Sequence, residues 1–200
     1  MTTLSPQMLI SGAGVLCQIR EHGICPAPLV RHFVQGVGRA RARRWDAAFV
    51  HHAGYWSHYD NRSGTSSWPL PATTIANDLG IFARKHRVLS DGGPQPGEIF
   101  VLYSPSRAAF VHTGIVVGVE PPTERFDGAL EYQCHTIEGN VTATGRPDGP
   151  LMGRGARILS PAFGDRTIRW ADLEPYETTT RQKVTDRMSV LAQDQLLRAA

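Results

Sequence analysis

The sequence contains few cysteines. Its 200 residues include only three, Cys17, Cys25 and Cys134, and no two of them form a Cys-x-x-Cys pair. An odd number of scattered thiols argues against a disulfide framework and against a zinc ribbon, because both need paired cysteines. We therefore expect the three side chains to be small hydrophobic groups in the core.

The chain also lacks a hydrophobic run long enough to cross a bilayer. The longest apolar stretch near its start, "MLISGAGVLCQI", is about half of what a membrane span requires, and Arg20 and Glu21 follow it directly. It has neither the basic leader nor the small-residue cleavage site of a signal peptide. We expect no membrane span, and a location in the cytoplasm, in an assembly or, after release by a non-classical route, outside the cell.

Charge is modest and unevenly placed. Charged residues make up 20% of the chain, the net charge is +3, and the excess is concentrated in "RARARR" at 39–44. A nucleic-acid surface would spread basic residues over a face with aromatic residues between them. Four arginines in one short connection instead indicate a solvated loop. The alternative is that these arginines bind an acidic protein surface. We expect no nucleic-acid partner.

Helical periodicity dominates the first half of the chain. Apolar residues recur at helical spacing over 15–19 and 29–37, which predicts two helices split by "EHGICPAP". The next stretch predicts a third helix from Trp45, with one apolar face made of Trp45, Phe49, Ala53 and Trp56. After a proline-rich loop, "ATTIANDLGIFARKH" predicts a fourth helix with an inward face of Ile75, Leu79 and Phe82.

The second half has the composition of a sheet. After the turn formers "DGGPQPGE", the runs "IFVLYS", "HTGIVVGVE" and "LEYQCHTIEGN" have strand length and many β-branched residues, and "ARILS" extends them. We therefore expect an α+β domain over 1–170, with a helical first half packed on a mostly antiparallel sheet. An apolar stripe in "TTRQKVTDRMSVLAQDQLLRAA" predicts a C-terminal helical extension over 171–200 that docks on this domain or on a partner.

Four motifs resemble those of the CHAP family, papain-like amidases and endopeptidases of the NlpC/P60 superfamily that cut peptidoglycan. In the family's order they are "WDAAFV" at 45–50, "PQPGEIFVL" at 94–102, "VHTGIVVGV" at 111–119 and "TIEGN" at 136–140. The helical lead-in is similar to that of phage and bacterial members, and "DGPLMGRGARI" is similar to their closing strand. The resemblance covers roughly residues 10–160 and implies a papain-like fold.

The resemblance also implies a site, and the sequence departs from the family at its centre. His112 matches the catalytic histidine, Glu138 the residue that orients it, and Asn140 a further polar group. Asp46 matches the nucleophilic cysteine. In a Cys-His site the imidazole and the helix N-terminus activate a thiolate that attacks an amide carbonyl. The departure therefore falls on the reacting group.

Aspartate suits this position structurally and not catalytically. Attack of a carboxylate on an amide gives a mixed anhydride, a far worse acyl intermediate than a thioester. A short acidic side chain in the first turn of a helix can instead cap backbone N–H groups, worth on the order of 1 kcal/mol. We expect Asp46 to cap the helix and to form an ion pair with His112, without turnover.

Other sources of chemistry fit the sequence less well. Cys134 lies on the third strand, away from the helix start. Asp46, His112 and Glu138 are a credible ligand set for zinc or a harder divalent ion, but a papain-like site is spaced for hydrogen bonds. We therefore expect no metal and no cofactor. Three further histidines have no chelating spacing and are expected on the surface or behind the site: His51, His52 and His58.

The expected function is that of a non-catalytic CHAP-like protein, a pseudoenzyme that serves as a binding or structural subunit. Its partner would be a protein in a larger assembly or a peptidoglycan peptide. The alternative is an active peptidoglycan amidase or endopeptidase that uses Asp46, His112 and Glu138.

Overall fold

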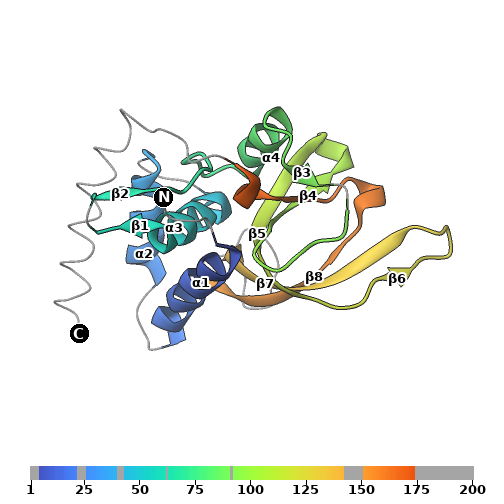
Figure 1. Ribbon diagram of the computed structural model, residues 1–200, viewed down its shortest axis with the longest axis horizontal. Helices are drawn as coiled ribbons and strands as arrows, with labels where there is room; N and C mark the ends of the chain where they lie inside the picture. The colour runs from blue at the N-terminus through green and yellow to red at the C-terminus, as the bar shows by residue number, and fades with distance from the viewer. Residues whose placement is uncertain are drawn as a thin grey trace.

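The computed structural model describes residues 5–21, 26–39, 43–61, 63–90, 92–141 and 151–173. Within these residues, helices form at each of the four places predicted in the first half of the chain. Three of them lie together to one side of a sheet, and the fourth packs against β4 and β5 (Figure 1). Their bounds are α1 Pro6–Glu21, α2 Pro26–Gly36, α3 Asp46–Ser57 and α4 Ala76–Lys85.

A sheet of seven strands, counted over the described residues, forms the second half. Its pairings are antiparallel, in the order β3-β9-β4-β5-β7-β6, and β8 joins β7. These helices and this sheet confirm the α+β class. The strands are β3 Leu89–Ser90, β4 Ile99–Ser104, β5 Ala109–Val119, β6 Thr123–Glu124, β7 Leu130–Val141, β8 Leu151–Leu159 and β9 Arg166–Ile168.

Short elements join these parts. A small hairpin of β1 (Tyr59–Asp60) and β2 (Thr65–Ser66) occupies a region that the sequence predicts as loop. Three 3-10 turns lie in the sheet half, at Pro105–Arg107, Pro161–Phe163 and Trp170–Asp172.

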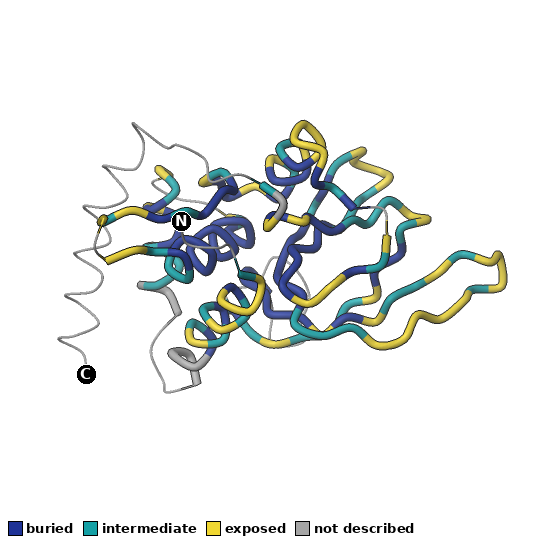
Figure 2. Tube along the Cα trace, viewed as in Figure 1, coloured by how far each residue is buried: buried dark blue, intermediate teal, exposed yellow. Residues whose placement is uncertain are grey.

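Helix α3 is enclosed by other elements of the fold. Each residue from Asp46 to Tyr55 is buried, between the other two N-terminal helices and the sheet (Figure 2). Trp45, Phe49 and Ala53 of the predicted apolar face are buried, and Trp56 is half-buried. The other faces of the helix are buried as well, because protein encloses it on all sides. Gly54 provides room on this helix for Trp68, since a Cβ there would lie 2.1 Å from the indole ring.

Helix α4 begins four residues later than its apolar pattern predicts. The side chain of Thr73 accepts a hydrogen bond from the Ile75 N–H (3.1 Å) and donates one to Asp78 Oδ2 (2.6 Å). With these bonds the loop before the helix continues as far as Ile75. Ile75 is the N-cap residue and is exposed. The inward position predicted for Ile75 is wrong, whereas Leu79 is buried and Phe82 packs against the core.

The histidines of α3 and its C-cap are buried, so of the two positions expected for them, on the surface or behind the site, the surface is wrong. His51, His52 and His58 are each less than a tenth exposed. Nε2 of His52 lies 3.1 Å from the carbonyl oxygen of Phe33. Nδ1 of His58 lies 2.9 Å from the Gly54 carbonyl oxygen, and Nε2 of the same ring accepts a hydrogen bond from the Ser5 N–H at 3.3 Å. These side chains join α3 to the elements around it.

The remaining expectations concern the thiols, the basic run and the chain end. Cys17 and Cys134 are buried, as expected, whereas Cys25 lies outside the described residues. Arg39 and Arg43 are exposed, as in a solvated connection. The predicted C-terminal helix lies almost entirely beyond Leu173, outside the described residues. Within the ranges that are described, no helix is long and apolar enough to cross a membrane.

Candidate functional site

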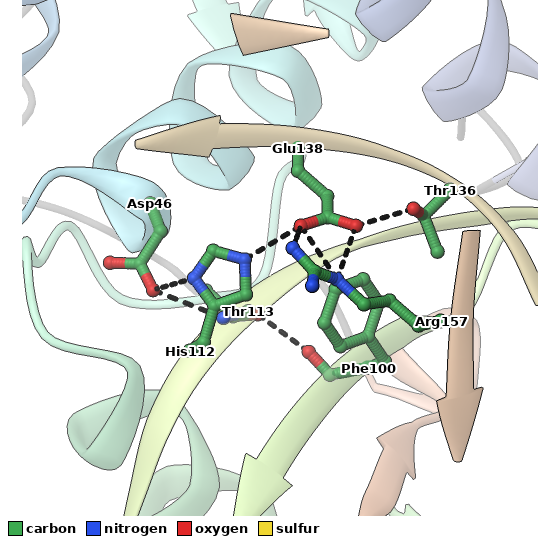
Figure 3. A network of polar contacts seen from close by, with 7 residues as sticks. All are labelled: Asp46, Phe100, His112, Thr113, Thr136, Glu138 and Arg157. Carbon is green, nitrogen blue, oxygen red and sulfur yellow. Dashed lines mark hydrogen bonds and ion pairs between the residues drawn. The ribbon is translucent and has the colours of Figure 1, made fainter. Parts of the chain in front are cut away.

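Three elements bring the predicted Asp46, His112 and Glu138 together (Figure 3). His112 lies on β5, Asp46 opens α3, and Glu138 lies on β7. Nε2 of His112 donates to Glu138 Oε2 at 2.7 Å, and Nδ1 lies 3.1 Å from Asp46 Oδ2. The second contact has the distance of an ion pair without the alignment of a hydrogen bond. Each ring nitrogen therefore faces a carboxylate.

Asp46 binds the sheet and does not cap its helix. Its Oδ2 accepts a hydrogen bond from the Thr113 N–H at 3.0 Å, and Trp45 occupies the N-cap position without a side-chain cap. The predicted capping role is therefore wrong, although the predicted ion pair with His112 is present. The other oxygen, Oδ1, is buried without a hydrogen-bond partner in the described part of the chain.

Glu138 is held by two residues that the sequence did not single out. Its Oε1 accepts from Thr136 Oγ1 (2.5 Å) and Arg157 Nε (2.9 Å), and its Oε2 accepts from Arg157 Nη2 (2.5 Å). The His112 ring and this guanidinium thus reach the same carboxylate. Figure 3 shows the resulting chain of contacts from Asp46 to Arg157.

Two glycines of β8 lie on the face of the sheet that carries the Glu138 side chain. In the strand register, Gly153 lies opposite Glu138 and Gly155 opposite Thr136, so both glycines share their face with these residues. A Cβ at Gly155 would lie 3.4 Å from Glu138 Oε1. The sequence signal that could have identified Arg157 is therefore "GRGAR", in which glycine alternates along one face before the arginine.

The pKa values of His112 and Glu138 are shifted in the directions that favour opposite charges on the two side chains. Burial lowers the pKa of His112, but the carboxylates of Asp46 and Glu138 outweigh it and raise the value above normal. Burial raises the pKa of Glu138, but His112, Arg157 and Thr136 outweigh it and lower the value. When His112 is protonated, negative and positive groups alternate from Asp46 through His112 and Glu138 to Arg157.

Gly114 allows the sheet to hold this network closely. A Cβ there would lie 2.7 Å from the Phe100 ring and 2.8 Å from Glu138 Cγ, too close for any side chain. The neighbouring Thr113 donates its hydroxyl to the Phe100 carbonyl oxygen at 2.7 Å. Both contacts fix the strand segment that carries His112.

Asn140, the fourth predicted residue, is buried at the bulged end of β7. Its φ of 61° lies in the left-handed region, which asparagine tolerates better than most residues. The backbone conformation by itself therefore accounts for an asparagine at this position.

The geometry opposes the two other chemistries considered for this sequence. One ion cannot contact the imidazole and both carboxylates, because Asp46 and Glu138 lie on different ring nitrogens. Within the described ranges, no group of three or more His, Cys, Asp or Glu residues is arranged to hold a metal. Burial raises the pKa of Cys134 to about 11, so its thiol stays protonated and is a poor nucleophile.

The site thus presents a buried, hydrogen-bonded network of alternating charges. Asp46 and His112 are each only 1% exposed. Comparison of the chain with models of known protein families, with curated proteins and with solved structures found no match to any of them.

Proposed function

We propose that this chain is a CHAP-like protein that has lost its nucleophile and serves, without turnover, as a binding or structural subunit. The observation that carries the proposal is the carboxylate of Asp46 against Nδ1 of His112. The order of elements supports the papain-like assignment, since a helix start, a histidine strand and a glutamate strand meet at one place.

Charge explains why His112 and Glu138 would persist without a thiol. A Cys-His hydrolase stores a thiolate beside an imidazolium. Asp46 supplies a negative charge at the same ring nitrogen, so the ion pair survives while the nucleophile is lost. The raised pKa of His112 keeps more of its ring protonated at neutral pH, and a protonated ring cannot accept a proton as a general base.

The contacts within the site give independent support. A general base or nucleophile must come within about 3 Å of the reacting group. In the wild type, Asp46 Oδ2 accepts a hydrogen bond from the Thr113 N–H and lies against Nδ1 of His112, and Nε2 of His112 donates to Glu138. These mutual contacts suit a structural role better than amide hydrolysis, and Asp46→Cys would remove the carboxylate from Nδ1.

Hydrolysis of purified peptidoglycan and of defined muropeptides, read by mass spectrometry, tests the proposal. We expect no product from the wild type and a gain of product in Asp46→Cys. Asp46→Ser is the matched control, because it has a similar size without a thiol. Asp46→Cys combined with His112→Ala should be inactive.

The results test the non-catalytic role and the CHAP-like assignment separately. Hydrolysis by the wild type that disappears in His112→Ala would overturn the non-catalytic role and favour a carboxylate mechanism. Silence from both the wild type and Asp46→Cys, with both folded, would contradict the CHAP-like part and remove peptidoglycan as the expected ligand.

A further inference from the structure

The strands at the edges of the sheet differ in length. Among the described strands, β3 and β6 each lie at an edge and have two residues, whereas β8 pairs with β7 alone and has nine. Figure 1 shows β8, in orange, beside β7. The outer side of an edge strand carries N–H and C=O groups that a further strand can bind, and proteins usually shorten or block such edges. Within the described residues, β8 is therefore the one long edge of the sheet.

The sequence of β8 does not protect this edge. It contains neither proline nor lysine, and its pairing with β7 is regular over 153–159, without a bulge. Its two arginines extend along their own chain. Arg157 forms an ion pair with Glu138, and Nη2 of Arg154 lies over α1, 3.9 Å from the position of a Cβ on Gly14.

The backbone of β8 is accessible in the middle of the strand. Gly153 and Gly155 are partly exposed, and because glycine has no side chain, this exposed surface is backbone. Near the end of the same strand, Ile158 is 62% exposed. A strand that pairs here gains main-chain hydrogen bonds and covers apolar surface. The edge therefore suits the addition of a strand.

The sequence of β8 also complements itself in the antiparallel direction. Gly155 is its middle residue, so a two-fold axis there would pair all nine residues with those of a second copy. An axis at Arg154 or Arg157 would instead place that arginine opposite itself. The register about Gly155 pairs apolar residues at the ends and each arginine with a small residue: Leu151 with Leu159, Met152 with Ile158, Gly153 with Arg157, and Arg154 with Ala156.

We propose that two copies of this chain pair through β8, antiparallel about Gly155, so that one sheet continues across both. The same surface is used on each copy, so the contact is isologous and closes at a dimer. The complementary register selects a second copy over an unrelated strand. The inference does not depend on the proposed loss of the nucleophile, because Asp46 and His112 lie on other elements.

Sedimentation velocity of the full chain over a range of concentrations measures this dimer. We expect the wild type to dimerise reversibly. Ala156 is exposed and would lie opposite Arg154 of the second copy, so each substitution acts at two places in the dimer. Ala156→Lys should weaken the dimer by about tenfold, because it opposes like charges twice, and Ala156→Glu should strengthen it. Ile81→Lys and Ile81→Glu make the same charge changes at an exposed position on α4 and should leave association unchanged.

A charge exchange tests the register. Ala156→Lys combined with Arg154→Glu should recover the dimer lost in Ala156→Lys, because opposite charges again face each other across the axis. Circular dichroism checks that each variant is folded. A wild type that stays monomeric at every concentration would overturn the proposal and would leave the edge to residues 174–200 of the same chain or to another protein. Oligomers larger than a dimer, or equal effects of Ala156→Lys and Ala156→Glu, would also overturn it.

Discussion

At the scale of single residues, His112 depends on partners at both ring nitrogens. The carboxylate of Glu138 in turn forms ion pairs with two side chains, those of His112 and Arg157. Removing one member of a buried charge network leaves another charge uncompensated, which costs far more than the net worth of the pair. Each member is therefore required by its neighbours, whether or not the site performs chemistry.

Glu138→Gln should destabilise the protein by about 3–5 kcal/mol, because it leaves His112 and Arg157 without their shared anion. Urea unfolding followed by circular dichroism measures the change. Glu124→Gln, an exposed position on β6, should change the free energy of unfolding by less than about 0.5 kcal/mol. A loss below about 1 kcal/mol in Glu138→Gln would contradict the network.

Asp46→Asn should lower the pKa of His112, because it removes one of the two carboxylates that raise it. In the wild type this raised pKa contributes stability that is fully present below about pH 6.5 and is lost as pH rises through the folded-state value. The variant should lose stability and should show less of this alkaline decline. NMR titration of the His112 ring in the wild type and the variant gives the two pKa values. An unchanged pKa would refute the ion pair.

At the scale of secondary-structure elements, packing decides what a glycine does. Gly14 in α1 and Gly54 in α3 are both interior helix glycines, where alanine gains about 1 kcal/mol of helix propensity. A Cβ at Gly14 has its nearest neighbour 3.9 Å away, at the end of Arg154. A Cβ at Gly54 would lie 2.1 Å from the Trp68 ring.

Gly54→Ala should therefore destabilise the protein by about 1–3 kcal/mol through overpacking, whereas Gly14→Ala should be neutral or stabilising. Thermal and urea unfolding of the two variants measure this difference. Equal effects of both substitutions would mean that Trp68 can move away from α3 at little cost.

The sequence predicted the helices and long strands well, because their apolar spacing is local information. Its errors came from contacts that depend on the assembled fold. Ile75 fits the helical pattern, but the Thr73 side chain delays the helix start. His51 is polar and was expected on the surface or behind the site, and it is buried because α3 is enclosed on every side. Asp46, His112 and Glu138 could be identified, whereas Arg157 reaches Glu138 only through the register of β7 and β8.

At the scale of the whole molecule, buried neutral histidines connect α3 and its C-cap to the neighbouring elements of the helical half. Burial lowers the pKa of His51 to about 4, that of His52 well below normal and that of His58 below normal. Neighbouring His51 and His32 lower that of His52 further. In the unfolded chain these side chains take up protons near pH 6.5, so acid favours the unfolded state.

Stability should fall as pH drops from about 6.5 toward 4, and His51 alone accounts for about 3 kcal/mol over that window. Urea midpoints measured between pH 7 and pH 5 follow the start of this fall. His51→Gln should flatten the slope even if its stability at pH 7 is lower. If His51→Gln left the pH dependence of the urea midpoint unchanged, the contribution predicted for His51 would be refuted.

The enclosure of His112 has a consequence for hydrogen exchange. Its two ring nitrogens face Asp46 and Glu138 inside the protein, so water can remove a ring proton only when the helix and the two strands separate. These protons should therefore persist in the proton NMR spectrum, and their exchange rate should report how often the centre of the molecule opens. One imidazole would thus measure a motion that involves both the helical half and the sheet.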